Sequence, residues 1–407
     1  MFGLLVFTLI FVVMLYKLIG FDYTDEVCML ALFGLFVRSM IKSPNWTFNK
    51  AFLATLLIFA FYTVYSFWIG SNSPGAILND LAIQIKPYMA FFCMYHLKPR
   101  LNDVRKKLLG DVALLVWIVF LLPVGVVAVF DIGILNDLME HPAYYGIAVT
   151  IAALCYLYGS RFTMRDKLVF FVLLSVGMLC GRSKFYGFFV MAFFVVIFFS
   201  REKQFRLSMK NILILCSMIA LIGVVAWEKI SLYFYQAIIG TGDVEKDMIA
   251  RFVLYYTAPE ILRDYFPFGS GLASYATHSS GLYYSELYTK YGIDTVWGLS
   301  KSFPNFISDT YYPSLAQFGV AGIVLFALFW VYVLRKAFVA YRRNGNAKLF
   351  TLVILIVGFL MIESTTGATF ISQGGFFVMM FLGIILTEMQ SADNTRPVPA
   401  ADTSTDG

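Results

Sequence analysis

The chain has 407 residues, of which 60% are apolar and only 14% are charged. An ordinary soluble domain carries roughly 25% charged residues, so this composition excludes a soluble globular protein and indicates an integral membrane protein. The formal net charge of +6 comes from short basic clusters between apolar runs. That pattern is typical of membrane topology and not of a nucleic-acid-binding surface.

The apolar runs predict twelve transmembrane helices, because a chain that crosses lipid must satisfy its backbone hydrogen bonds within each segment. The first run has neither a basic start nor a small-residue cleavage site, so we interpret it as a retained helix and not as a signal peptide. We therefore expect an all-α, polytopic membrane protein. The expected spans are residues 2–20, 27–41, 51–70, 76–97, 110–131, 144–160, 168–181, 184–200, 211–228, 312–334, 349–363 and 368–387.

One long polar segment, residues 228–311, separates the nine helices of residues 1–227 from the three helices of residues 312–389. Basic clusters occupy every second connection between spans, as cytoplasmic loops do under the positive-inside rule. This alternation predicts that both termini face the cytoplasm and that the long segment is periplasmic. Residues 390–407, rich in Ala, Asp, Thr and Pro, predict a disordered cytoplasmic tail.

The five cysteines lie in or beside apolar runs, and none is paired at a metal-ligand spacing. We interpret them as small core residues and expect no metal site, no disulfide framework and no cofactor. They are Cys28, Cys93, Cys155, Cys180 and Cys216.

The sequence Gly-Arg-Ser-Lys at residues 181–184 places two cations on the side where the charge rule expects few. The span that starts near Lys184 has its helix N-terminus here, where unpaired N–H groups together with Arg182 and Lys184 would form an anion site. Arginine suits a phosphate because its planar guanidinium donates to two oxygens at once. Alternatively, both side chains extend to lipid headgroups, as interfacial cations often do.

Lys86 lies near the middle of the span 76–97. A lysine at that depth costs roughly 2.5–3.5 kcal/mol on insertion, so it usually faces the bundle interior and finds a partner. Asp80, six residues earlier, lies on a different face of the helix, and Pro87 is expected to kink the span. Two interpretations remain, an ion pair with another helix and a substrate-binding cation.

Within the long segment, residues 247–264 have the apolar spacing of a helix, with Arg251 in its first turns and a break expected at Pro259. The sequence Pro-Phe-Gly-Ser-Gly at 267–271 predicts a turn and does not form a nucleotide-binding loop. The alternating carboxylates of Asp243, Glu245 and Asp247 are typical of a solvated acidic patch, with a metal-binding loop as the alternative.

Tyrosines are dense in the same segment, and they predict either an interfacial aromatic belt or surfaces that stack on sugar rings. The two roles can apply to different members. They include Tyr255, Tyr256, Tyr265, Tyr275, Tyr283, Tyr284 and Tyr288.

Several of these motifs, taken in order, resemble the O-antigen polymerase and ligase superfamily. The run from Arg251 through Pro-Phe-Gly-Ser-Gly, followed by Ser-Asp-Thr-Tyr-Tyr-Pro before the next span, resembles the core signature of that family. His-Pro-Ala-Tyr-Tyr-Gly at 141–146 and Gly-Arg-Ser-Lys at 181–184 resemble two of its helix starts. The resemblance covers roughly residues 131–322. Asp309 stands where many members, especially the ligases, have a histidine, which favours a Wzy-type polymerase.

The resemblance implies metal-independent glycosyl transfer at the periplasmic face of the bacterial inner (plasma) membrane. Undecaprenyl-pyrophosphate-linked oligosaccharides would be joined there into a polysaccharide such as O-antigen, capsule or exopolysaccharide. A flippase and a chain-length regulator are the implied partners, together with membrane lipid, and no nucleic acid is expected.

The resemblance also implies roles for individual residues. Arg182 and Arg251 would bind the departing pyrophosphate, where a fixed donor can contribute about 3 kcal/mol, with Lys184 and Arg263 as further cations. The general base would be Asp309, for which a helix N-cap is the structural alternative, or His278 or His141. Further candidate binding residues are Lys86, Tyr255, Tyr256 and Glu363.

Two competing hypotheses remain. An O-antigen ligase would share the same motifs and differ in its acceptor. A secondary transporter or flippase would suit twelve spans and an intramembrane lysine, but the two halves of the chain show no internal repeat, which such proteins usually carry.

Overall fold

The computed structural model describes residues 1–20, 23–43, 48–198 and 246–391. In these residues the chain is all-α, as expected, and no strand forms. The expected span 211–228 and the expected tail from residue 392 lie outside the description. The α-helices are α1 (Phe2–Phe7), α2 (Tyr16–Ile19), α3 (Thr24–Lys42), α4 (Lys50–Ile69), α5 (Pro74–Leu97), α6 (Asp103–Val116), α7 (Leu122–Phe130), α8 (Gly133–Met139), α9 (Pro142–Gly159), α10 (Met164–Ser175), α11 (Ser183–Phe198), α13 (Lys246–Asp264), α14 (His278–Leu282), α15 (Leu287–Lys290), α16 (Tyr311–Ser314), α17 (Gly319–Asn344), α18 (Ala347–Glu363) and α19 (Gln373–Ser391).

Short stretches of other helix types extend several of these elements. Thr8–Met14 and Trp117–Leu121 are π-helical and continue α1 and α6, whereas Val176–Cys180 and Leu315–Phe318 are 3₁₀ turns. Each expected span in the described part of the chain coincides with one helix or with consecutive helices.

Five helices among the described residues are long and apolar enough to cross a membrane, which supports a multi-pass membrane protein. They are Lys50–Ile69, Asp103–Phe130, Pro142–Gly159, Tyr311–Asn344 and Gln373–Ser391. Two shorter apolar helices, Phe2–Met14 and Ser183–Ile197, accompany them. The other expected spans and the sidedness of the bundle stay predictions.

Two local expectations differ from the structure. Helix α13 continues through Pro259 instead of breaking there. Pro259 and Tyr255, whose carbonyl loses its helical partner, both lie on the exposed side of α13, so only one exposed hydrogen bond is forfeited. The long apolar helix expected from residue 312 begins at Gly319, because Gly319 has a φ of +64°, outside the right-handed helical region, and separates it from the turns at 311–318.

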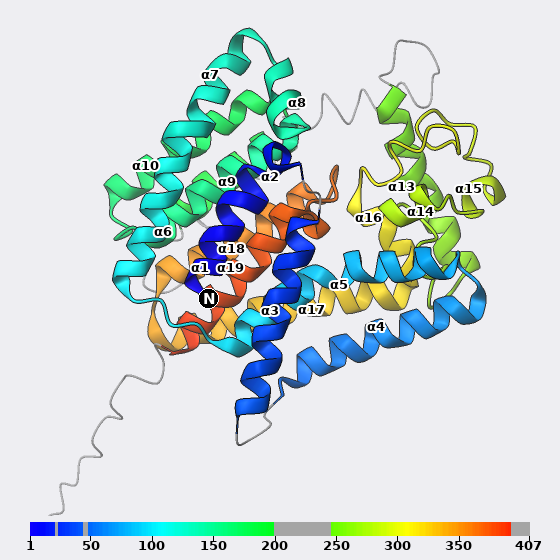
Figure 1. Cartoon of the computed structure of the whole chain (residues 1–407), viewed down its shortest axis with the longest axis horizontal. Helices are drawn as coiled ribbons and strands as arrows, with labels where there is room; N and C mark the ends of the chain where they lie inside the picture. The colour runs from blue at the N-terminus through cyan, green and yellow to red at the C-terminus, as the bar shows by residue number, and fades with distance from the viewer. Residues whose placement is uncertain (21–22, 44–47, 199–245, 392–407) are drawn as a thin grey trace, which may run out of the picture.

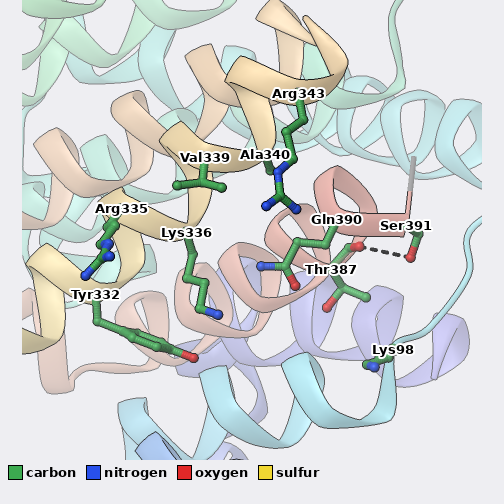
Figure 2. Close-up of a pocket in the computed structure, with 10 residues that line it drawn as sticks. All are labelled: Lys98, Tyr332, Arg335, Lys336, Val339, Ala340, Arg343, Thr387, Gln390 and Ser391. Carbon is green, nitrogen blue, oxygen red and sulfur yellow. Dashed lines mark hydrogen bonds between the residues drawn. The ribbon is translucent and has the colours of Figure 1, made fainter. Parts of the chain in front are cut away.

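The helices have two distinct ends (Figure 1). The N-terminus and the C-terminal end of α19 lie at the same end of the bundle, and α1 packs against α19. Basic side chains from α5, α17 and the connection after α5 gather there, around a cavity beside α19 (Figure 2). We call this end, with Lys98, Arg335, Lys336 and Arg343, the basic end.

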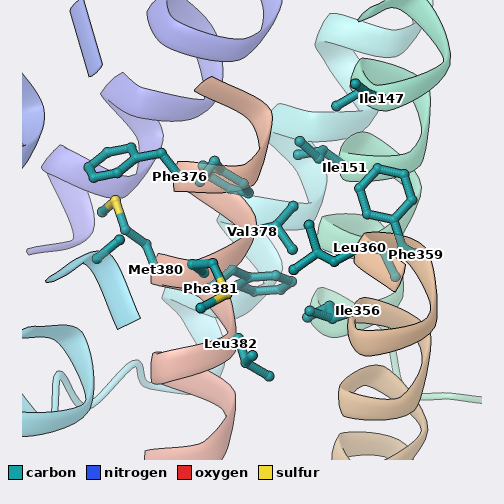
Figure 3. Packing of buried hydrophobic residues seen from close by; sticks show 14 of the residues in the cluster. Ile147, Ile151, Ile356, Phe359, Leu360, Phe376, Val378, Met380, Phe381 and Leu382 are labelled. Atoms are coloured by element: carbon teal, nitrogen blue, oxygen red, sulfur yellow. The ribbon is translucent and has the colours of Figure 1, made fainter. Parts of the chain in front are cut away.

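The core of the bundle is built around α19 and α9, whose residues are mostly buried. Figure 3 shows Phe381 and Leu382 of α19 facing Ile356 and Leu360 of α18, with Ile151 of α9 beside them. Helix α19 also packs closely against α5. A Cβ atom on Gly383 would lie 2.7 Å from the carbonyl oxygen of Phe91, so only a glycine permits this approach.

Residues 246–316 have a second, smaller hydrophobic core of their own, which includes Leu254, Ile261, Tyr275 and Leu299. In Figure 1 these helices (green to yellow) lie at one side of the molecule, at the end of α4, α5 and α17. The segment is therefore a compact helical unit and not a loose loop.

The Pro-Phe-Gly-Ser-Gly turn attaches this unit to the bundle. The backbone N–H of Ala273 donates to the buried Asp80 carboxylate of α5 at 2.8 Å, and the N–H of Leu272 donates to Ser66 of α4 at 2.8 Å. A Cβ on Gly269 would lie 2.2 Å from the backbone nitrogen of Gly319, so the turn and the start of α17 touch backbone to backbone. The predicted turn is confirmed, and its contacts are structural.

We predict that Gly319→Ala destabilises the protein. The added methyl would meet backbone atoms of 267–269 at 2.3–2.6 Å, and the positive φ adds strain. We expect the apparent melting temperature in detergent to fall by about 5 °C or more. Gly34→Ala in α3 is the matched control, because no atom lies within 4 Å of its added methyl, and it should not lower the melting temperature. Equal melting temperatures for the two variants would contradict the close approach.

Candidate functional site

Arg182 stands at the start of α11, as the sequence predicts. The left-handed Gly181 ends the preceding turn, α11 begins at Ser183, and the Arg182 carbonyl accepts from the N–H of Phe185 at 3.0 Å. The Arg182 guanidinium reaches across to α9, where Nη2 lies 2.9 Å from Nε2 of His141.

His141 is the N-cap of α9, and its ring meets two donors. Nδ1 lies 3.2 Å from the N–H of Ala143, while Nε2 faces Arg182. A guanidinium can only donate, and a neutral imidazole has a lone pair on one nitrogen only. The ring therefore satisfies one of these two donors at a time. An anion placed beside Arg182 would resolve this competition by accepting from the guanidinium.

Lys184, one turn into α11, forms a buried ion pair with Glu363 at the end of α18. Nζ and Oε2 are 2.7 Å apart, and the two side chains are 9% and 2% exposed. Gly367 covers the lysine so closely that a Cβ there would lie 2.7 Å from Nζ. Lys184 is thus committed to a carboxylate partner, and neither residue extends to lipid headgroups.

Arg251 of α13 pairs with Asp309, which lies just before α16. Nη2 and Oδ2 are 2.7 Å apart, and both side chains are partly exposed. The Tyr255 hydroxyl, one turn along α13, donates to the carbonyl of Thr365 at 2.6 Å. Thr365 follows Glu363 by two residues, so the Arg251 end of the helical unit is attached to the part of the bundle that holds Lys184.

Tyr144 of α9 connects the two groups. Its ring packs edge-on against His141, with 6.5 Å between ring centroids. Its hydroxyl lies within the electrostatic influence of Asp309 and of Glu140. Four cationic or imidazole side chains and two carboxylates, from five segments of the chain, therefore converge. We call this group the ion-pair face: Arg182, His141, Lys184, Glu363, Arg251 and Asp309, with Tyr144 between them.

Lys86 resolves to a cross-helix ion pair. Its ammonium group contacts the carboxylate of Asp25 and lies 2.8 Å from Oε1 of Glu26, both at the start of α3. Asp25 also contributes to the electrostatic environment of Tyr144, so the triad lies near the ion-pair face. Asp80, on another face of α5, is used separately to hold Ala273.

Three candidates lie apart from this group. His278 is exposed at the start of α14, which packs against α5. Arg263 is 76% exposed and pairs with its neighbour Asp264 at 3.0 Å; the hydrogen bond from Arg263 lowers the pKa of the Asp264 carboxyl. Tyr256 is 67% exposed and stacks on Phe252. No printed contact in the described part of the chain joins any of the three to the ion-pair face.

The tyrosines divide into two classes. Tyr275 and Tyr288 are fully buried in the second core, and burial raises the pKa of both phenols well above their usual range. They are therefore neutral packing residues that donate hydrogen bonds inside the unit. Tyr256 and Tyr283 keep exposed rings, which suits contact with lipid or with a sugar.

Sequence reasoning missed Tyr144 and Glu140. Tyr144 belongs to the His-Pro-Ala-Tyr-Tyr-Gly motif, so the motif itself was the available signal. Glu140 has a φ of +66° and accepts from the Tyr16 hydroxyl at 3.0 Å. That contact joins residues 124 positions apart, which no local pattern reveals.

Among the described residues, no group of three or more His, Cys, Asp or Glu side chains could hold a metal ion. The side chains of Asp243, Glu245 and Asp247 lie outside that part of the chain. No protein-family model and no curated protein sequence matches the chain. The family therefore stands as the resemblance of its motifs.

We predict that breaking the buried Lys184–Glu363 pair from one side costs about 3–5 kcal/mol, because the remaining charge is left unpaired. Lys184→Met and Glu363→Gln should each lower thermal stability in detergent, whereas the double variant Lys184→Met/Glu363→Leu should recover most of the loss. Arg263→Met, which breaks an exposed pair, should change stability little. Additive losses in the double variant would show that the two side chains do not interact.

Proposed function

We propose that this chain is a membrane glycosyltransferase that polymerises lipid-linked oligosaccharides. Its substrates would be repeat units carried on undecaprenyl pyrophosphate in the bacterial inner membrane, and it would need no metal ion. The observation that carries the proposal is the convergence of Arg182 and Arg251, from α11 and α13, around His141, Tyr144 and Asp309. A flippase would supply the units, and a chain-length regulator would be the further partner.

The chemistry requires cations that meet a diphosphate as it leaves. The acceptor hydroxyl oxygen attacks the anomeric carbon, the bond from that carbon to the pyrophosphate oxygen breaks, and the departing diphosphate gains negative charge. Fixed guanidinium donors stabilise this charge more in the transition state than in the ground state. Arg182 and Arg251 suit this role because each can donate to two phosphate oxygens at once.

The pairing within the ion-pair face supports an exchange of partners on binding. A diphosphate that accepts from Arg182 relieves the two-donor competition at His141. A diphosphate that accepts from Arg251 releases the Asp309 carboxylate, which then takes the proton of the acceptor hydroxyl as general base. Asp309 is the favoured base, because it contacts a diphosphate-binding residue and His278 lies apart.

Lys184 and Glu363 have a supporting role in this proposal. Their buried pair fixes the first turn of α11 against the end of α18, which orients Arg182 two residues earlier. The exposed rings of Tyr256 and Tyr283 offer surfaces on which sugars of the repeat unit can stack.

We predict that Arg182→Ala and Arg251→Ala each reduce polymer formation by about 10²–10³-fold, the loss typical of one transition-state donor. Lys301→Ala, an exposed cation of the same unit, is the matched control and should make normal polymer. Protein level in the membrane is measured alongside polymer length on gels. Full-length polymer from either arginine variant would remove that residue from the mechanism.

We predict that the charge-swapped variant Arg251→Asp/Asp309→Arg also fails to make polymer. The swap rebuilds the ion pair but exchanges the positions of the diphosphate ligand and the base. Thermal stability should recover relative to Arg251→Asp alone, whereas activity should not. Recovery of polymer together with stability would show that the pair has only a structural role.

A transporter is the second candidate, because Lys86 is buried with Asp25 and Glu26 between α5 and α3, and buried ionisable groups often mark transport pathways. We predict that the purified protein lengthens lipid-linked repeat units in detergent without nucleotide sugar or divalent cation. Movement of units across vesicles without lengthening would favour transport. Transfer of the glycan from its carrier to another lipid would favour a ligase.

A further inference from the structure

A second polar site lies at the basic end, away from the ion-pair face. The two sites are separated by the length of α18, whose 17 residues extend about 25 Å. A cavity of about 630 Å³ opens there between the C-terminal ends of α5, α17 and α19. This volume is typical of a pocket for a small ligand or a headgroup.

Cationic side chains dominate the lining of this cavity. Lys98 comes from the end of α5, and Arg335, Lys336 and Arg343 come from α17. Figure 2 shows Lys336 and Arg343 extending from α17 towards Gln390 and Thr387 of α19, with Lys98 on the opposite side. Positive charge therefore converges from two sides on the polar side chains of α19.

Within the described chain, no carboxylate lines the cavity to balance these charges. Glu388 lies on the same turn of α19 as Gln390 but is used elsewhere. Its two oxygens accept from Lys106 at 2.5 Å and from the Tyr158 hydroxyl at 2.6 Å. Clustered like charges repel one another, and an anion bound among them removes that repulsion.

The hydrogen-bonding groups around the cavity suit a phosphate. Arginine and lysine donate to phosphate oxygens, and the Gln390 amide adds neutral donors. Both α17 and α19 belong to segments that are long and apolar enough to cross a membrane. Basic pockets between such helices, at the level where the helices end, are where acidic lipid headgroups bind.

We propose that this cavity binds a phosphate anion, either as the headgroup of an acidic phospholipid or as free phosphate. The site is independent of glycosyl transfer, because it shares no residue with the ion-pair face. Binding would brace the ends of α5, α17 and α19 against one another, since the cations come from α5 and α17 and the amide from α19.

The test compares lipid binding by the full chain in detergent, measured by native mass spectrometry with phosphatidylglycerol and with phosphatidylcholine. The cavity variant Arg335→Gln/Lys336→Gln should bind phosphatidylglycerol about tenfold or more weakly than the unaltered chain, since each basic residue contributes appreciably to binding of acidic lipid. The matched control Arg342→Gln/Lys107→Gln removes the same charge from exposed residues that do not line the cavity. Its preference for phosphatidylglycerol should be unchanged.

Two further measurements identify the source of the phosphate. If inorganic phosphate raises the melting temperature of the unaltered chain and displaces phosphatidylglycerol, the site takes free phosphate as well. If only the lipid does so, the site is a headgroup site; in either case the cavity variant should lose the effect. The proposal is overturned if the cavity and control variants bind phosphatidylglycerol equally, or if the unaltered chain binds both lipids equally and shows no response to phosphate.

Discussion

The backbone contact between Gly269 and Gly319 is the constraint on which the arrangement of the site depends. Two chain segments fifty residues apart approach so closely that neither can carry a side chain, and the Asp80 carboxylate holds the adjoining N–H of Ala273. This junction fixes the position of the 246–316 unit relative to α4, α5 and α17. Arg251 and Asp309 both belong to that unit, so their position against α9 and α11 follows from the same contact.

Charge pairing explains why so many segments meet at one face. A charge withdrawn from water needs a partner with good geometry, and removing one partner is more costly than removing both. Each cation of the ion-pair face accordingly takes its partner from a different segment: Lys184 from α18, Arg182 from α9, and Arg251 from the residues before α16. A face assembled in this way is preorganised for an anionic substrate, because its cations are held in place before the substrate arrives.

Local sequence patterns predicted the elements well and the contacts poorly. The start of α11 at residue 183, the turn at 267–271 and the helical spans follow from capping, glycine and hydropathy, all of which act within a few residues. The partner of Lys86 was expected on another helix, but nothing in the sequence selects Asp25 and Glu26, about sixty residues earlier. The continuation of α13 through Pro259 was missed for a related reason, since it depends on which side of the helix is exposed.

Gly367 shows how a residue can be constrained by a distant side chain instead of its own backbone. Its φ is not in the left-handed region, and a glycine in such a loop would ordinarily be attributed to the turn. Here the space for its missing Cβ is occupied by the ammonium group of Lys184. Positions 184 and 367 should therefore covary among related sequences: where the lysine is replaced by a shorter side chain, alanine or serine becomes acceptable at 367. Such paired changes would record the buried ion pair in sequence data alone.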